Sequence, residues 1–118
     1  MWDIEFTDEF GEWWSELSVD EQESLTVGVK LLQVLGPALG RPHADTVKRS
    51  RHRNMKELRT QAHRRPLRTF YAFDPRRKAI LLIGGDKTGD KRFYDRMIPL
   101  ADTLLDEHLQ QLQNNGEI

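Results

Sequence analysis

The stretch "NMKELRTQAHRRPLRTFYAFDPRRKAILLIGGDKTGD", Asn54–Asp90, contains three runs whose composition is typical of β-strands. We expect strands at about Asn54–Thr60, Leu67–Phe73 and Lys78–Ile83, with Asp74-Pro75 marking the turn between the last two. The "AILLI" run is apolar on both faces, which favours a central strand covered on both sides. The other two runs alternate or mix, so each of these strands can offer one face to solvent.

The chain before this stretch alternates like a strand and then takes helical spacing. Trp2–Phe6 predicts a first strand, and Thr7 can cap a helix that follows it. Ser18 and Glu21 have the spacing of a capping box, which predicts a second helix that Gly36-Pro37 ends. Because only a residue or two separates these helices, we expect an antiparallel helical hairpin.

Two further segments complete the predicted order. Gly40–Arg53 is polar, basic and short of apolar periodicity, so we expect an exposed loop with a short strand near Thr46–Lys48. A last helix is expected from about Lys91 to Gln113, and Pro99 should kink or restart it. Its apolar stripe consists of Phe93, Met97, Leu100, Leu104, Leu105 and Leu109. The order β-α-α-β-β-β-α predicts one small α+β domain over residues 1–118, with an antiparallel-rich sheet, an N-terminal helical hairpin and a C-terminal helix.

Length and composition exclude several classes of protein. A chain of 118 residues can build one core but not a cofactor domain together with a substrate domain. Without cysteine it has no disulfide, no thiolate metal site and no Cys nucleophile. The four histidines lack metal-ligand spacing, so we expect neither metal nor cofactor. The absence of a long apolar run and of a signal-like leader predicts a cytoplasmic protein that does not bind membranes.

Charge is distributed unevenly along the chain. The net charge is −1, but residues 41–78 hold thirteen Lys/Arg and three Asp/Glu, a local charge of +10. Residues 1–40 hold one Lys and nine Asp/Glu, a local charge of −8. A basic concentration of this kind is typical of proteins that bind nucleic acid phosphates, although a solvated face paired with the acidic ends would have the same composition.

The motifs in this basic region resemble a known family. "KELRTQAHRRPLRTFYAFDPRRKAILLIGGDKTGD…FYDRMIPLAD" is similar to the core of the RelE/ParE toxin superfamily, and most similar to its HigB-type, phage-derived branch. The shared pattern is a strand ending in E-L-R, a strand with Arg before Tyr-Ala-Phe, an apolar strand, a Lys-containing loop and a closing helix. The resemblance covers about Met55 to Ala101.

This resemblance implies a RelE-like fold and the toxin of a type II toxin–antitoxin system. The implied activity is that of an mRNA interferase, a metal-independent endoribonuclease that cuts mRNA in the ribosome and so inhibits translation and growth. The 2′-hydroxyl of the message attacks the adjacent phosphate, giving a 2′,3′-cyclic phosphate and a 5′-hydroxyl. The implied partners are mRNA, the ribosome and a cognate antitoxin, which we expect to be a helix-turn-helix protein.

Four residues are the candidates for catalysis. Arg59 and Arg68 can each hold two phosphate oxygens, and in a hairpin they should lie near each other at one end of the sheet. Glu57 either accepts the 2′-hydroxyl proton or holds Arg59 in place as an ion-pair partner. Lys87 matches the family's basic position after the apolar strand, where it would donate to the leaving oxygen or stabilise charge.

The RNA-binding candidates surround this group. They are Lys56, Arg64, Arg65, Arg92 and Tyr94. Arg64 and Arg65 lie at the tip of the predicted Thr60–Pro66 loop, where they would grip ribosomal RNA phosphates. Lys56 also competes with Glu57 as a base, although it could point with Leu58 toward the core.

Two alternatives to an interferase stay open. A DNA gyrase poison of the ParE type shares the fold and the basic strands, but it does not need Glu57, Arg59 and Arg68 clustered for chemistry. A nucleic-acid-binding relative without catalysis is the other alternative, because Asp86 and Asp90 dilute the charge of the last loop.

Overall fold

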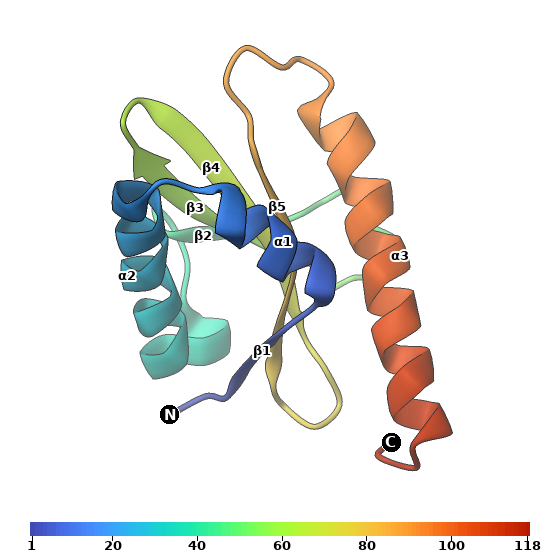
Figure 1. Ribbon diagram of the computed structural model, residues 1–118. Helices are drawn as coiled ribbons and strands as arrows, with labels where there is room; N and C mark the ends of the chain where they lie inside the picture. Colours follow the sequence, from blue (N-terminus) through green and yellow to red (C-terminus); the bar gives the residue numbers. More distant parts are fainter.

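A five-stranded mixed sheet forms the centre of the computed structural model, which describes residues 1–118 (Figure 1). Its strands are β1 (Ile4–Phe6), β2 (Ala44–Thr46), β3 (Lys56–Ala62), β4 (Arg65–Phe73) and β5 (Ala79–Asp86). They lie in the order β1-β5-β4-β3-β2, in which β1 runs parallel to β5 and all other neighbours are antiparallel. The predicted α+β fold with an antiparallel-rich sheet is therefore confirmed.

Three α-helices accompany the sheet. They are α1 (Asp8–Glu16), α2 (Val19–Leu35) and α3 (Phe93–Asn114), and a short 3₁₀ helix, η1 (Gly36–Ala38), follows α2. Both predicted caps are present, because the Thr7 side chain accepts a hydrogen bond from the Phe10 N–H and Ser18 forms the capping box with Glu21. Gly36 ends α2 with a φ of +55°, and a Cβ at this position would lie 2.3 Å from the Trp2 indole, so glycine is required there.

The sheet separates two hydrophobic cores, one on each face. On one face, α1 and α2 pack through residues such as Phe10 and Leu25 against Tyr71 and Leu81. On the other face, α3 packs through residues such as Phe93 against a core that includes Phe70. Figure 1 shows α2 and α3 on opposite sides of the sheet. Neighbouring residues such as Phe70 and Tyr71 of β4 thus point into different cores.

The predicted "AILLI" strand is β5, which lies inside the sheet between β1 and β4 as expected, and β4 is the middle strand of the five. That run, in β5, is covered on both faces as expected, but β4 is buried from Leu67 to Ala72 and has neighbours on both edges. The prediction that β4 offers one face to solvent is wrong along most of its length. The polar residues Arg68 and Thr69 indicated a solvent-facing side, but both are buried.

The predicted Thr60–Pro66 loop is a tight hairpin turn. β3 continues to Ala62 and β4 begins at Arg65, so the turn consists of His63 and Arg64 alone. Both residues have positive φ angles, 48° and 65°, as a two-residue turn of type I′ requires. The Asp74–Lys78 turn at the opposite end of β4 lies where it was predicted.

The basic segment before β3 is only partly an exposed loop. Its short strand, β2, lies two residues earlier than predicted and pairs with β3 at the sheet edge. Val47 and Met55 are buried in the α3-side core. The buried Asp102 of α3 accepts hydrogen bonds from the Ser50 hydroxyl and, at 3.1 Å, from the Arg51 N–H. The part of the chain from Val47 to Met55 is therefore attached to the α3 side of the sheet.

α3 is a single helix that continues through Pro99 without a restart. Leu100, predicted in its apolar stripe, is 41% exposed, and Ile98 and Ala101 are buried instead. The other predicted stripe residues are buried or packed against the core, so the prediction is wrong at Leu100 alone. None of the three α-helices combines the length and apolarity needed to cross a membrane.

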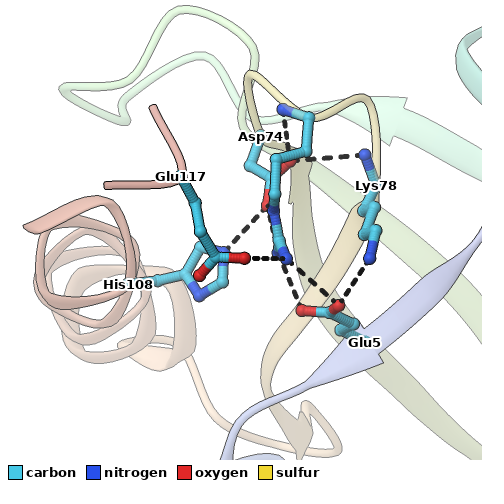
Figure 2. A network of polar contacts seen from close by, with 6 residues as sticks. Glu5, Asp74, Lys78, His108 and Glu117 are labelled. Carbon is cyan, nitrogen blue, oxygen red and sulfur yellow. Dashed lines mark hydrogen bonds and ion pairs between the residues drawn. The ribbon is translucent and has the colours of Figure 1, made fainter. Parts of the chain in front are cut away.

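A network of charged side chains joins three elements at the end of the sheet opposite the hairpin turn. Figure 2 shows Glu5 of β1, Asp74 and Glu117 around one arginine, while His108 of α3 contacts Asp74 and Lys78 contacts Glu5 and Asp74. That arginine is Arg76, which lies 2.7 Å from Asp74, 2.8 Å from Glu5 and 3.6 Å from Glu117. Asp74 is buried away from water, so its contacts with charged groups are strong. The network therefore connects the β4–β5 turn firmly to β1 and α3.

Candidate functional site

The candidate site lies on the α3 side of the sheet, where α3 leaves part of β3 and β4 uncovered. Glu57 and Arg59 are two apart in β3 and therefore share a face, and Arg68 lies directly across from Arg59 in β4. The predicted proximity of the two arginines is confirmed as direct cross-strand pairing. Tyr94, in the first turn of α3, reaches the same group.

A buried carboxylate forms the centre of this group. The Tyr94 hydroxyl donates a 2.7 Å hydrogen bond to Glu57 Oε1, and Arg68 Nε lies 3.6 Å from the same oxygen. Glu57 therefore pairs with Arg68, and the predicted ion pair with Arg59 is wrong. Burial, and then the hydrogen bond to Glu57, raise the pKa of Tyr94, so its hydroxyl stays protonated at neutral pH.

The two arginines differ in how much of their hydrogen-bonding capacity is used. Arg68 is buried, and its Nη1 donates to the Leu67 carbonyl at 3.0 Å, while its Nε–H has no hydrogen-bond partner. A buried donor without a partner is rare and destabilising, which is typical of functional positions. Arg59 is partly exposed, and its guanidinium makes no hydrogen bond or ion pair with the rest of the protein. It is free to bind an anionic ligand.

A pocket of about 300 Å³ opens beside these residues, and Glu57, Arg59 and Tyr94 line it. Lys87 reaches the other side of the group, with its Nζ 5.3 Å from the centre of the Tyr94 ring. The Lys87 backbone N–H donates to the Pro66 carbonyl at 3.0 Å, which holds the loop after β5 close to the hairpin. The structure thus brings together all four predicted catalytic residues and Tyr94.

Two predicted RNA-binding residues lie elsewhere. Lys56 precedes Glu57 in β3, so strand alternation places it on the α2 side of the sheet together with Leu58. Arg65 also lies outside the group, because its guanidinium is 2.6 Å from Glu21 of α2 and 2.8 Å from Asp86. We therefore treat Arg65 as a structural residue that connects the hairpin to α2.

Two further predicted RNA-binding residues, Arg64 and Arg92, are exposed cations near the site. Arg64 occupies the hairpin turn, and Arg92 immediately precedes α3. Neither side chain makes a hydrogen bond or ion pair within the protein, so both stay available to a ligand. Nowhere do three or more His, Asp or Glu side chains come together in a way that could hold a metal ion.

The sequence interpretation missed the cations on either side of β2. Arg41, Lys48 and Arg49 line the same pocket as Glu57. Asp45 of β2 lies directly across from Glu57 and is held 2.7 Å from Arg41. The clustering of basic residues between positions 41 and 53 was a usable signal, but the absence of periodicity there gave no indication of which face of the sheet the segment covers.

A solved structure identifies the type of fold. One chain of the intact RelBE toxin–antitoxin complex of E. coli superposes with a TM-score of 0.50 at 14% sequence identity, covering 72% of this chain and 95% of that chain. At this identity the likeness concerns the fold alone. The fold is that of the RelE-type toxins, as the sequence motifs predicted.

Sequence comparison then identifies the family. Residues 12–106 match the model of the phage derived protein Gp49-like family (DUF891), so the chain belongs to this family. A Mycobacterium tuberculosis (strain ATCC 25618 / H37Rv) protein that bears the toxin name HigB3 is 45% identical over 105 residues, which cover 88% of this chain and 90% of that protein. HigB2 of the same strain is 42% identical over 104 residues, 86% of this chain, which spans about half (52%) of HigB2. The predicted relationship to the HigB-type, phage-derived branch is confirmed.

Proposed function

We propose that this protein is the toxin of a toxin–antitoxin system and that it stops growth by cutting mRNA on the ribosome. Membership of the Gp49-like family and two relatives with HigB toxin names support the toxin assignment. A cognate antitoxin follows from that assignment, and we propose that it is a helix-turn-helix protein. The endonuclease activity rests on the geometry of the site.

The observation that carries the endonuclease proposal is the contact of a carboxylate with a phenol and a guanidinium beside a free arginine. Glu57 accepts a hydrogen bond from Tyr94 and lies 3.6 Å from Arg68, while Arg59 stands unpaired at the mouth of the same pocket. A gyrase-binding surface or a passive RNA-binding surface needs cations but no buried carboxylate among them. A phosphoryl-transfer site needs both.

In the proposed reaction, the 2′-oxygen of the RNA forms a bond to phosphorus and the bond from phosphorus to the 5′-oxygen breaks. Glu57 takes the proton of the 2′-hydroxyl, and Lys87 supplies a proton to the leaving 5′-oxygen. The products are a 2′,3′-cyclic phosphate and a 5′-hydroxyl, so water and oxidants take no part. Glu57 gains one proton and Lys87 loses one, so the number of protons on the protein does not change.

Charge that accumulates on the phosphorane needs donors already in position. Arg59 can reach two non-bridging oxygens, because its guanidinium has no competing partner. Arg68 acts through Glu57, because its Nε pairs with this carboxylate and holds it beside the pocket. Tyr94 keeps its proton and donates to Glu57, which restricts the carboxylate to one orientation.

The test is induction of the wild-type protein and of Glu57→Gln in growing cells, followed by primer extension on an abundant message. The wild type should produce cuts within the reading frame, with 5′ ends that polynucleotide kinase labels without prior dephosphorylation. Glu57→Gln preserves the shape of the side chain and should reduce cutting about 10²–10⁴-fold. Intact messages together with arrested replication would instead identify a gyrase poison and overturn the endonuclease proposal.

A further inference from the structure

A groove continues from the candidate site along the segment between β2 and β3. Its first part is the 300 Å³ pocket beside Glu57 and Arg59, and its second part, of about 480 Å³, lies against Pro99 of α3. The residues that line both parts are Arg49, Tyr94 and Ile98. Because the two parts share three lining residues they adjoin each other, and we call them together the loop–helix groove.

One wall of the loop–helix groove carries cations that a ligand can recruit. Lys48 is exposed and makes no ion pair within the protein. Arg49 lies 2.7 Å from Asp95, and Arg51 lies 2.7 Å from Asp106. All four of these paired side chains are at least 44% exposed, and exposed ion pairs are weak. A phosphate can therefore displace either carboxylate from its arginine.

The opposite wall, formed by α3, presents the Tyr94 ring together with Ile98 and Pro99. Two carboxylates also lie in this wall, but Asp95 is paired with Arg49, and Asp102 is buried and accepts hydrogen bonds from the Ser50–Arg51 segment. Flat apolar and aromatic surfaces facing a line of cations suit single-stranded nucleic acid, because bases and riboses contact one wall while phosphates contact the other. A protein or peptide partner would need apolar side chains at a spacing that this shallow wall does not specify.

The cationic wall is rigid before any ligand arrives. Asp102, which is 3% exposed, accepts hydrogen bonds from the Ser50 hydroxyl and the Arg51 N–H. On either side of these contacts, Val47 and Met55 are buried in the core. A preformed wall loses little conformational entropy when a ligand binds, which strengthens binding.

We propose that the loop–helix groove binds the single-stranded RNA that flanks the scissile phosphate, with Lys48 and Arg49 contacting its backbone phosphates. This inference rests on the proposed function, since it extends the binding surface of the same site. The proposal places RNA contacts on the segment between β2 and β3, which is distinct from the hairpin turn and from the loop after β5. The contacts are to phosphates, riboses and the faces of bases rather than to base edges, so the groove adds affinity for any sequence.

The test measures binding of a short RNA oligonucleotide whose riboses are all 2′-O-methylated, so that it has no nucleophile and cannot be cut. Fluorescence anisotropy gives Kd at several salt concentrations for the wild type and for the double variant Lys48→Ala/Arg49→Ala. Removing two phosphate contacts should weaken binding at least tenfold. It should also reduce the slope of log Kd against log salt by about 1.4, since each contact to a single strand contributes about 0.7.

A matched control removes two exposed cations outside the groove. Lys30→Ala/Arg53→Ala changes the net charge equally and should keep the wild-type slope. Asp95→Asn works in the opposite direction, because it frees Arg49, and should tighten binding about twofold to fivefold. Circular dichroism of each variant confirms that the fold is retained.

The two proposals fail in different ways. Equal slopes for the groove variant and its control, or no measurable binding by the wild type, would overturn the groove while leaving primer extension to decide the endonuclease. Cuts that disappear in Glu57→Gln but persist in the groove variant at wild-type rates would likewise retain the proposed function and remove the groove from it.

Discussion

Arg59 and Arg68 are direct cross-strand partners in β3 and β4, yet only Arg59 is free to bind a ligand. Arg68 is 7% exposed, donates to the Leu67 carbonyl and lies beside Glu57. Arg59 is partly exposed and has no partner in the protein. Two residues of one type, opposite each other in a hairpin, therefore have separate tasks in the mechanism we propose, in which Arg59 binds phosphate and Arg68 positions the carboxylate.

Arg59→Ala should abolish toxicity without loss of stability. The guanidinium makes no hydrogen bond or ion pair within the protein, so the free energy of unfolding should change by less than about 0.5 kcal/mol. Cutting should fall about 10²–10³-fold, the usual effect of removing one preorganised donor from a transition state. Arg59→Lys should restore part of the rate, because an ammonium group cannot make the two-pronged contact. Arg53→Ala, an exposed cation without partners, is the matched control and should stay toxic.

Arg68→Ala should reduce both stability and cutting. Glu57 would remain buried without its cation, and breaking a buried ion pair typically lowers the free energy of unfolding by about 3 kcal/mol. Urea unfolding measures this loss. In the double variant Glu57→Gln/Arg68→Ala the charge is gone, so the total loss should be smaller than the sum of the two single losses. Additive losses would show that Arg68 does not act through Glu57.

Arg76→Ala should destabilise the protein strongly at neutral pH, although Arg76 lies far from the site. Burial raises the pKa of Asp74, but hydrogen bonds from Arg76 and His108 outweigh it and hold the pKa below its usual value. The stability from this network is thus present above about pH 4 and lost as pH falls through the folded-state pKa of Asp74.

We expect Arg76→Ala to lose about 3 kcal/mol at pH 7, as for other buried ion pairs that lose one partner. Urea unfolding at pH 7 and pH 3 measures the difference from the wild type, which should narrow at the lower pH. A constant difference at both values would mean that packing, rather than ionised Asp74, carries the effect. Arg76 is consequently unsuitable as a charge control for the site.

Tyr71→Phe should change how stability depends on alkaline pH. Burial raises the pKa of Tyr71 to about 12, and its hydroxyl has no hydrogen-bond partner. Because the folded-state pKa is raised, its stability contribution is complete below about pH 10 and is lost as pH rises toward 12.

At pH 7 the variant should be as stable as the wild type or more stable by up to about 1 kcal/mol, because an unpaired buried hydroxyl is removed. Between pH 10 and pH 12 the wild type should lose about 2–3 kcal/mol more than the variant, which corresponds to a two-unit shift. Urea unfolding across this range provides the measurement, and parallel curves would contradict the assignment.

Arg64→Gly should stabilise the hairpin. Arg64 has a φ of +65°, a conformation that is unfavourable by about 1 kcal/mol for a residue with a Cβ. Glycine removes this strain, so the free energy of unfolding should rise by up to about that amount. Arg64→Ala removes the same charge but keeps the Cβ, and it should give no gain. Equal stabilities of the two variants would show that the turn stores no strain.

Local patterns were sufficient to predict most of the elements of this fold. The caps at Thr7 and Ser18, the turn after Asp74 and the pairing of β3 with β4 all depend on residues within a few positions of each other. Hydrogen bonds over such short separations form in much the same way in any compact chain, so the sequence pattern is enough to predict them. The meeting of Arg59 with Arg68 follows from the same local pairing.

Long-range contacts decided which of the many cations are free. Arg65 and Arg76 look like Arg59 in the sequence, but they bind Glu21 and Glu5, 44 and 71 positions away. Asp102, 51 positions from Arg51, likewise fixes a segment that resembles an exposed loop. The charge of a side chain is a property of its residue, whereas its availability depends on which carboxylates the packed helices and strands bring within about 4 Å of it.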